Sequence, residues 1–187
     1  KNATKIERLK DVVRGGSEYA DDAWYEIGRT YISASEYEDG ISVLEDFIDN
    51  NLHSPYYIPA LMNLGLGYYN LYMYDEARDK YKLVIEADPQ SQTALEALRA
   101  IREIYVTRSD IDGYFEFANS CGVQSDMGIA ARDSLTFTVA RNEYLDGDIN
   151  LAAVKLRTYL DEFEVGYNRT EALFYLSDCF IRIDDKE

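Results

Sequence analysis

The sequence predicts an all-α protein, a right-handed α-solenoid of stacked antiparallel helix hairpins. Three observations lead to this fold class: apolar residues recur at helical spacing, a residue pattern repeats at an offset of 37, and turn-forming residues are scarce, with 3 Pro and 11 Gly in 187 residues. The chain has room for about four and a half to five such repeats.

The repeat is clearest in the segments 24–31 and 61–68. In each, a large apolar residue is followed by Gly four positions later and by Tyr seven positions later. Further along, each segment has a Tyr and then a small residue at matching offsets: Tyr37 and Gly40, Tyr74 and Ala77. The first spacing marks one face of a helix, and the small residues allow a second helix to pack closely against it.

The same register continues to the end of the chain. Arg102, Ala140 and Ser177 stand where the first two repeats have Gly28 and Gly65. The five repeats begin at residues suited to helix N-caps: Ser17, Ser54, Ser91, Gly128 and Gly166.

Each repeat is therefore expected to form a helix A, a tight turn and a helix B. The A helices are expected at 17–34, 54–71, 91–108, 128–145 and 166–183, and the B helices at 37–50, 74–87, 111–121 and 148–163. The first residues carry a helix B pattern, with Ile6, Leu9, Val12 and Val13 on one face. The expected core includes Trp24, Tyr31, Leu64, Tyr68 and Phe180.

Two places depart from the pattern. In the third repeat Tyr114 occupies the small position and Gly122 interrupts helix B, so we expect a shorter or shifted helix there. Pro59 would break a helix interior, so the second A helix is expected to start nearer Tyr57.

No linker or low-complexity segment divides the sequence, so we expect one domain over 1–187. It would consist of a partial repeat 1–16, repeats 17–53, 54–90, 91–127 and 128–165, and a partial repeat 166–187. Because the pattern begins in the second half of a repeat and stops after a helix A, we expect the chain to be a piece of a longer array.

Composition excludes several classes of function. A net charge of −16 repels nucleic acid, and no apolar stretch is long enough for a membrane span. The single histidine, His53, and the two cysteines, Cys121 and Cys179, form no metal-binding or disulfide pattern. We expect no cofactor, no metal site and no catalytic residues, and therefore not an enzyme.

Several motifs have a structural explanation that we prefer. Asp146-Gly147-Asp148 lacks the Gly and Glu that an EF-hand calcium loop needs further along, and falls at a turn between helices. Cys121 and Cys179 are expected as packed apolar side chains. The sequon at Asn168 carries no weight. The acids from Glu36 to Asp49 are read as a solvated helix face, with a docking face for a basic partner as the alternative.

The pattern resembles the tetratricopeptide repeat family. The residues that carry the resemblance are Leu61, Leu64, Gly65, Tyr68, Tyr74, Ala77, Tyr81 and Asp88-Pro89. The longer unit, with Ser and aromatic residues at its start, also resembles repeat arrays of bacterial cell-envelope proteins of the TolA-binding and outer-membrane-assembly lipoprotein type. That second resemblance implies the cell envelope or periplasm, and the cytoplasm stays open as the alternative.

The family resemblance implies that A helices line a partner-binding groove. The positions that the family uses, and that carry interface-type side chains here, are Tyr25, Arg29, Ile32, Met62, Leu66, Tyr69, Asn70, Arg99, Phe137, Arg141, Tyr144 and Phe174. We therefore expect a non-catalytic scaffold that binds a peptide or helix of a partner protein. The apolar side chains would take its apolar residues, and Arg29 and Arg141 would pair with its carboxylates or carbonyls.

A second hypothesis is a self-assembling element whose repeats stack end to end. It is motivated by an apolar face in 166–183, formed by Leu173, Leu176 and Phe180. The charge distribution indicates that the groove suits an apolar, weakly charged partner. Residues 1–14 carry five bases and two acids, and the excess of acids lies mainly outside the groove positions.

Overall fold

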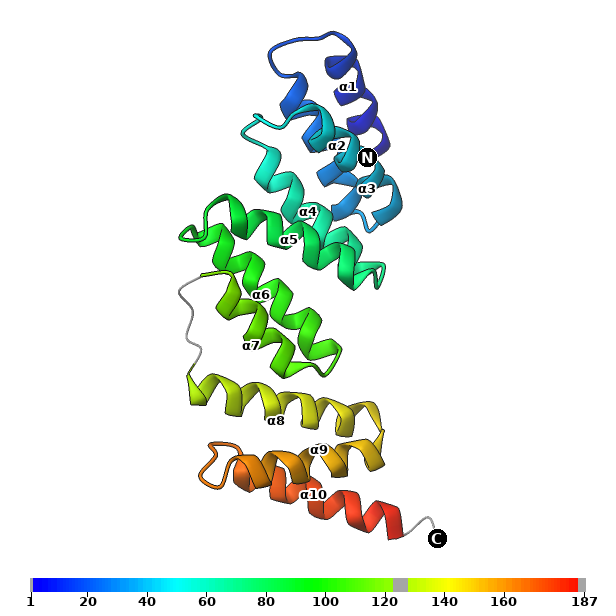
Figure 1. The fold of residues 1–187 in the computed structure, drawn as a ribbon. Coiled ribbons are helices and arrows are strands. Elements are labelled where there is room, and N and C mark those ends of the chain that lie inside the picture. The colour runs from blue at the N-terminus through cyan, green and yellow to red at the C-terminus, as the bar shows by residue number, and fades with distance from the viewer. Residues whose placement is uncertain (1, 123–127, 185–187) are drawn as a thin grey trace. The chain divides into compact units, whose positions relative to one another are not determined.

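The computed structural model describes residues 2–122 and 128–184, and within these ranges the chain forms ten helices and no strand (Figure 1). The helices are α1 (Asn2–Arg14), α2 (Ala20–Ser33), α3 (Tyr37–Asn50), α4 (Tyr57–Asn70), α5 (Tyr74–Ala87), α6 (Gln92–Thr107), α7 (Ile111–Ser120), α8 (Ile129–Asp146), α9 (Ile149–Glu162) and α10 (Arg169–Asp184). The predicted all-α fold is confirmed. α2, α4, α6, α8 and α10 are the A helices, and the others are B helices.

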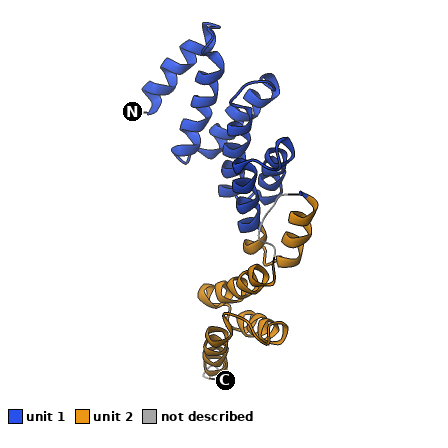
Figure 2. Cartoon of the chain, turned by 90° about the vertical axis from the view of Figure 1, so that its left-hand side faces the viewer, with its two compact units in different colours: residues 1–104, 121–123 blue, residues 105–120, 124–187 orange. Residues whose placement is uncertain are grey.

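The chain divides into two compact units, shown in different colours in Figure 2. Unit 1 comprises residues 1–104 and 121–123, and unit 2 comprises residues 105–120 and 124–187. The hairpins α2–α3 and α4–α5 belong to unit 1, and the hairpin α8–α9 packs with α10 in unit 2. The boundary falls within α6.

Each hairpin turn has the same backbone geometry. A left-handed residue follows helix A by two positions at Ser35, Tyr72 and Ser109 and by one position at Gly147, with φ between 58° and 89°. The amide of the next residue then donates to a carbonyl five residues back, as from Glu36 to Tyr31 and from Asp148 to Glu143. This is the Schellman motif, which ends a helix and satisfies its last carbonyls. It is why helix B begins at the same register position in each hairpin.

Small residues bring the two helices of a hairpin together, as the sequence predicts. A Cβ atom added at Gly28 would lie 2.4 Å from the side chain of Leu44, and one added at Gly65 would lie 2.5 Å from the ring of Tyr81. Ala77 is fully buried. The close approach leaves no room for a larger residue at these positions.

The starts of the A helices differ from the prediction at three of the five N-cap positions. Ser17, Ser54 and Gly166 open a turn, and the helix starts three residues later. At Ser17 and Ser54 the hydroxyl accepts from the amide two residues on, which is a serine turn and not an N-cap bond. Only Ser91, among these serines, caps as predicted, because its hydroxyl accepts from the amide of Ala94.

The second and third repeats behave as the sequence indicates. α4 begins at Tyr57, as Pro59 predicts. α7 has 10 residues, where α3, α5 and α9 each have 14. Cys121 lies after the end of α7 and is half-buried, so the expectation that it packs at a core position of helix B is wrong.

Each unit has its own apolar core. In unit 1 it is built from Leu44, Phe47, Leu61, Leu64 and Val84, all 1% exposed or less. In unit 2 a single cluster joins α8, α9 and α10; its members are Phe137, Ala140, Ile149, Ala152, Ala153, Leu156, Tyr159, Leu160, Phe163, Ala172 and Cys179.

Some of the predicted core residues lie nearer the surface. Trp24, Tyr31 and Tyr68 are half-buried. Phe180 is 42% exposed, although the guanidinium of Arg157 in α9 lies over its ring at 5.5 Å. None of the described helices is long and apolar enough to cross a membrane.

Candidate partner-binding surface

The predicted binding residues lie on the A helices, and we refer to them as the A-helix surface. Ten of the twelve have accessible side chains: Tyr25, Arg29, Met62, Leu66, Tyr69, Asn70, Arg99, Arg141, Tyr144 and Phe174. Ile32 and Phe137 are 4% and 3% exposed and belong to the core. Because the units are described separately, this surface has a unit 1 part and a unit 2 part.

Ile32 and Phe137 are buried for different reasons. Ile32 fills the space left by two glycines, since a Cβ atom at Gly40 or Gly67 would lie 2.6 or 2.8 Å from its Cδ1 atom. The ring of Phe137 lies 5.6 Å from that of Tyr159 in the unit 2 cluster. Neither side chain is available to a partner in this arrangement.

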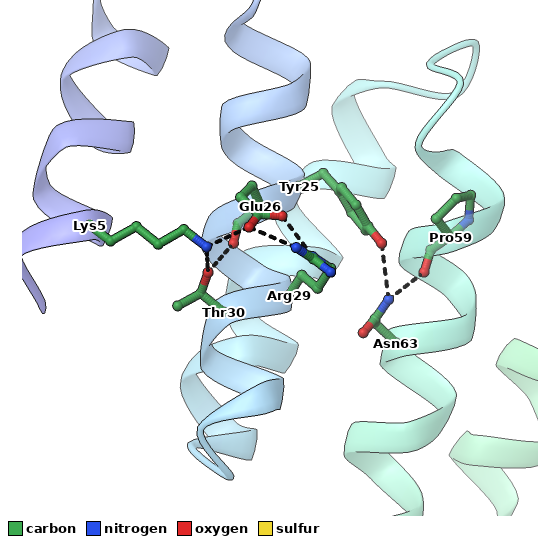
Figure 3. A network of polar contacts seen from close by, with 7 residues as sticks. All are labelled: Lys5, Tyr25, Glu26, Arg29, Thr30, Pro59 and Asn63. Carbon is green, nitrogen blue, oxygen red and sulfur yellow. Dashed lines mark hydrogen bonds and ion pairs between the residues drawn. The ribbon is translucent and has the colours of Figure 1, made fainter. Parts of the chain in front are cut away.

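In unit 1, Tyr25 of α2 points toward α4 (Figure 3). Its hydroxyl accepts a 3.3 Å hydrogen bond from the amide of Asn63, which also donates to the carbonyl of Pro59. Its ring stacks on Tyr56 at 5.1 Å between centroids. Partial burial raises the pKa of the Tyr25 hydroxyl, so the side chain stays neutral near pH 7. Tyr25 is therefore a fixed, amphipathic platform between two A helices.

Arg29 already has a partner within the chain. Its guanidinium donates to both carboxylate oxygens of Glu26, at 2.7 and 2.9 Å. The ammonium of Lys5 in α1 donates to the same carboxylate and to the hydroxyl of Thr30 (Figure 3). Hydrogen bonds from Arg29 and Lys5 lower the pKa of Glu26 to about 2. Glu26 thus stays ionised and holds both cations in place.

The rest of the unit 1 part is apolar with polar edges. Leu66 is 45% exposed, and Met62 and Tyr69 are half-buried. The amide of Asn70 donates to the carbonyl of Leu66 within the same helix. The ring of Tyr69 contacts that of Tyr74 at 5.5 Å.

In unit 2 an aromatic cluster spans α8 and α10. Tyr175 is central: its ring lies 4.6 Å from Tyr144, 6.4 Å from Phe137 and 5.7 Å from Phe174. Phe174 is 67% exposed and forms the accessible end of the cluster. The hydroxyl of Tyr144 donates a 2.6 Å bond to Asp178, which raises the pKa of this tyrosine.

Two arginines flank this cluster and differ in their partners. Arg182 pairs with Asp178 at 2.7 Å and lies over the ring of Tyr144. Arg141 lies over the ring of Phe137 at 5.9 Å, and its buried Nε atom has no hydrogen-bond partner within the described residues. A buried N–H without an acceptor is unfavourable, so a shift of the half-buried Arg141 side chain that brings its Nε atom to an acceptor would be favourable.

A further cavity of about 230 Å³ lies in unit 2 beside the start of α7. Its two cations are engaged: Arg132 binds Asp112 and Glu162, and Lys155 binds Glu143 at 2.7 Å. The hydroxyl of Ser109, which lines the cavity, donates to Glu143, but the hydrogen bond from Lys155 lowers the pKa of this carboxylate and makes it a weak base. We assign no chemistry to it.

The other motifs have these places in the structure. Gly147 forms the left-handed turn, and Asp148 caps α9 by accepting from the amide of Leu151. Cys179 is fully buried, and burial raises the pKa of its thiol. His53 is exposed in a loop. Within the described residues no group of three or more His, Cys, Asp or Glu side chains is placed to hold a metal ion.

Two features escaped the sequence interpretation. Glu45, read as part of a solvated acidic face, is half-buried and accepts from the hydroxyl of Tyr68 and the ammonium of Lys80. Asp133, which no pattern singled out, is 2% exposed and binds Tyr159. The only available hint was that Asp133 stands on the apolar side of a predicted helix.

The fold and this surface define a class, the helical repeat proteins built from stacked hairpins. Within that class, residues 59–91 match the sequence model of the tetratricopeptide repeat. No curated protein matches the chain.

Solved structures agree with this assignment. A tetratricopeptide repeat protein from Parabacteroides merdae shares 14% identity at a TM-score of 0.52; the match covers 96% of this chain and 66% of that one. A kinesin light chain candidate from Podosopora anserina, with nearly identical TPR-like repeats, shares 15% identity at a TM-score of 0.52, over 82% of this chain and 83% of that one. The predicted resemblance to the tetratricopeptide repeat family is confirmed, and the fold is one that generally serves as a protein-interaction scaffold.

Proposed function

We propose that this chain binds a segment of a partner protein along its A-helix surface. The observation that carries the proposal is the combination in unit 2 of an exposed aromatic side chain, Phe174, with a cation, Arg141, whose buried Nε atom has no hydrogen-bond partner within the described residues. Both belong to one aromatic cluster through Phe137 and Tyr175. Aromatic residues and arginine are enriched where binding energy concentrates at interfaces.

The partner segment would place an apolar side chain against Phe174 and an acceptor against Arg141. A carboxylate or a backbone carbonyl would supply that acceptor. Arg29 has a different role in this proposal from the one predicted, because Glu26 already pairs with it. In unit 1, Tyr25, Leu66 and Tyr69 would offer mainly apolar and stacking contacts.

The proposal is tested by selecting peptides from a random display library against the full chain. The affinities of the selected peptides are then measured for the variants Arg141→Ala and Phe174→Ala. The matched control is Leu83→Ala, which removes an apolar side chain of 41% exposure from the B helix α5.

We expect each A-helix variant to weaken binding by about ten-fold, or about 1.4 kcal/mol, and the control to leave it unchanged. Selected peptides that bind all three variants alike would show that the partner sits elsewhere. Phe137 is unsuitable for this test, because replacing a core residue would lower the stability of unit 2.

A further inference from the structure

The outer side of α1 and the adjoining edge of α2 form a basic surface on an acidic protein. We define this α1 basic surface by Lys5, Arg8 and Leu9 of α1 and Arg29 of α2. The whole chain has a net charge of −16, yet residues 1–14 contain five bases and two acids. The first helix therefore has an excess of bases, although the chain as a whole has an excess of acids.

Two hollows meet on this surface and share Lys5. One, of about 540 Å³, is lined by Thr4, Lys5, Arg8 and Leu9. The other, of about 170 Å³, lies between α1 and α2 and is lined by Asn2, Lys5, Glu26, Arg29, Thr30 and Ser33. The first combines cations with the aliphatic side chain of Leu9, and the second offers hydrogen-bond donors from both helices.

The cations of this surface are ordered but not fully neutralised. Glu26 holds the ammonium of Lys5 and the guanidinium of Arg29, as Figure 3 shows. One carboxylate therefore serves two cations. Arg8 is exposed, and no carboxylate of the described residues lies within ion-pair distance of it. By contrast, Lys10 and Arg14 on the same helix pair with Glu7 and Asp11. The local charge of the surface is thus positive.

From this charge and shape we propose that the α1 basic surface binds an acidic peptide segment that also carries an aliphatic side chain. Carboxylates would pair with Arg8 and with the free donors of Lys5 and Arg29, and the aliphatic side chain would pack on Leu9. A short peptide suits a local patch, because charges in physiological salt act over about 8 Å and the acids elsewhere on the chain are screened. The surface lies mainly on the B helix α1 and shares only Arg29 with the A-helix surface, so it does not depend on the function proposed for that surface.

The test uses the full chain and a fluorescein-labelled probe, acetyl-Glu-Leu-Glu-Glu-Leu-Glu-amide. Two matched peptides replace either every Glu by Gln or every Leu by Ser. The variant Arg8→Glu removes a cation that has no ion-pair partner among the described residues. Lys82→Glu makes the same charge change on α5, where Lys82 is about half exposed. Circular dichroism checks that both variants fold.

We expect saturable binding of the probe that Arg8→Glu weakens by about ten-fold and Lys82→Glu by less than about two-fold. Both matched peptides should bind more weakly than the probe, and added salt should weaken the probe further. Equal effects of the two variants, equal binding of either matched peptide, or no binding at about 1 mM probe would overturn the proposal.

Sedimentation of the chain without peptide tests whether a second copy of the chain, and not an acidic peptide, occupies the α1 basic surface. If the chain associates at low salt and Arg8→Glu makes it monomeric, a second copy's acidic surface occupies the site and the peptide assignment is overturned. A monomer at low salt supports the peptide. The affinities of the selected peptides for Arg141→Ala and Phe174→Ala report separately on the A-helix surface, so either proposal can fail without the other.

Discussion

The hydroxyl of Tyr159 in α9 donates a 2.6 Å hydrogen bond to the carboxylate of Asp133 in α8, and both side chains are buried. The same carboxylate accepts from the backbone amide of Tyr167 and the side-chain amide of Asn168, and the tyrosine oxygen accepts from the backbone amide of Asn168. Burial and Asp133 raise the pKa of Tyr159 to about 12. This network ties the loop before α10 to the preceding hairpin.

Replacing Tyr159 by Phe should lower the free energy of unfolding by roughly 1–3 kcal/mol, because Asp133 loses a donor and the Asn168 amide loses an acceptor in a buried site. Urea unfolding followed by circular dichroism measures the change. Tyr167→Phe is the matched control: its ring is 85% exposed, and its backbone amide keeps the bond to Asp133. A loss no larger than that of the control would show that water replaces the tyrosine hydroxyl.

Gly65→Ala tests the close approach of α4 and α5. Alanine favours a helix over glycine by about 1 kcal/mol, so propensity alone predicts stabilisation. The added Cβ atom would lie 2.5 Å from the ring of Tyr81, which is 4% exposed and cannot move freely. We expect overpacking to prevail, with a net loss of about 1–3 kcal/mol in the free energy of unfolding.

A double-mutant cycle identifies the cause of that loss. In a Tyr81→Leu background the same Gly65→Ala change should cost less, because the ring that it meets is gone. An equal cost in both backgrounds would assign the effect to the backbone. Gly15→Ala serves as a control, since its nearest neighbours would be backbone atoms at 3.4 and 3.5 Å.

The left-handed turn residues predict changes of opposite sign at equivalent positions. Ser35 has φ 62° and is exposed, so Ser35→Gly should raise the free energy of unfolding by about 1 kcal/mol. Gly147, with φ 89°, occupies the equivalent place in the turn of the fourth repeat. Gly147→Ser should therefore lower the free energy of unfolding by a similar amount. Thermal melts of both variants check the pair. Two shifts of the same sign would contradict the shared turn geometry.

The sequence predicts the helices well because their pattern is periodic. The B helices 37–50 and 74–87 have the bounds that the repeat indicates, since small residues and the turn fix the register locally. The A helix α2 starts later than predicted, whereas α4 starts at Tyr57, as Pro59 indicates. Neither Ser17 nor Ser54 is the N-cap that the repeat suggests, because serine suits both a serine turn and an N-cap, and the two differ only in backbone conformation.

The candidate site was less predictable, because exposure depends on residues of other helices. Ile32 is buried since two neighbouring helices present glycines to it, a fact about volumes at distant positions. The Asp133–Tyr159 hydrogen bond does not recur from repeat to repeat. The position of Tyr159 holds Phe47 and Val84 in earlier repeats, and neither side chain has a hydroxyl. A repeat pattern identifies what repeats contain in common and misses contacts that occur once.

Glu26 should make the stability of the chain depend on pH in the acid range. Its pKa falls from 4.5 to about 2 on folding, chiefly through hydrogen bonds from Arg29 and Lys5. A lowered pKa in the folded state stabilises the protein above pH 4.5, and this contribution is lost as the pH falls toward 2. Glu26→Gln removes it. Urea unfolding at several pH values should therefore show the largest difference between wild type and variant above pH 4.5, and this difference should shrink toward pH 2.

As a control, Glu86→Gln changes an exposed residue whose ion pair with Lys82 is longer, at 3.5 Å, and should have little effect. A Glu26→Gln difference that stays constant from neutral pH to pH 2 would mean that Glu26 stabilises the chain by packing, without its charge.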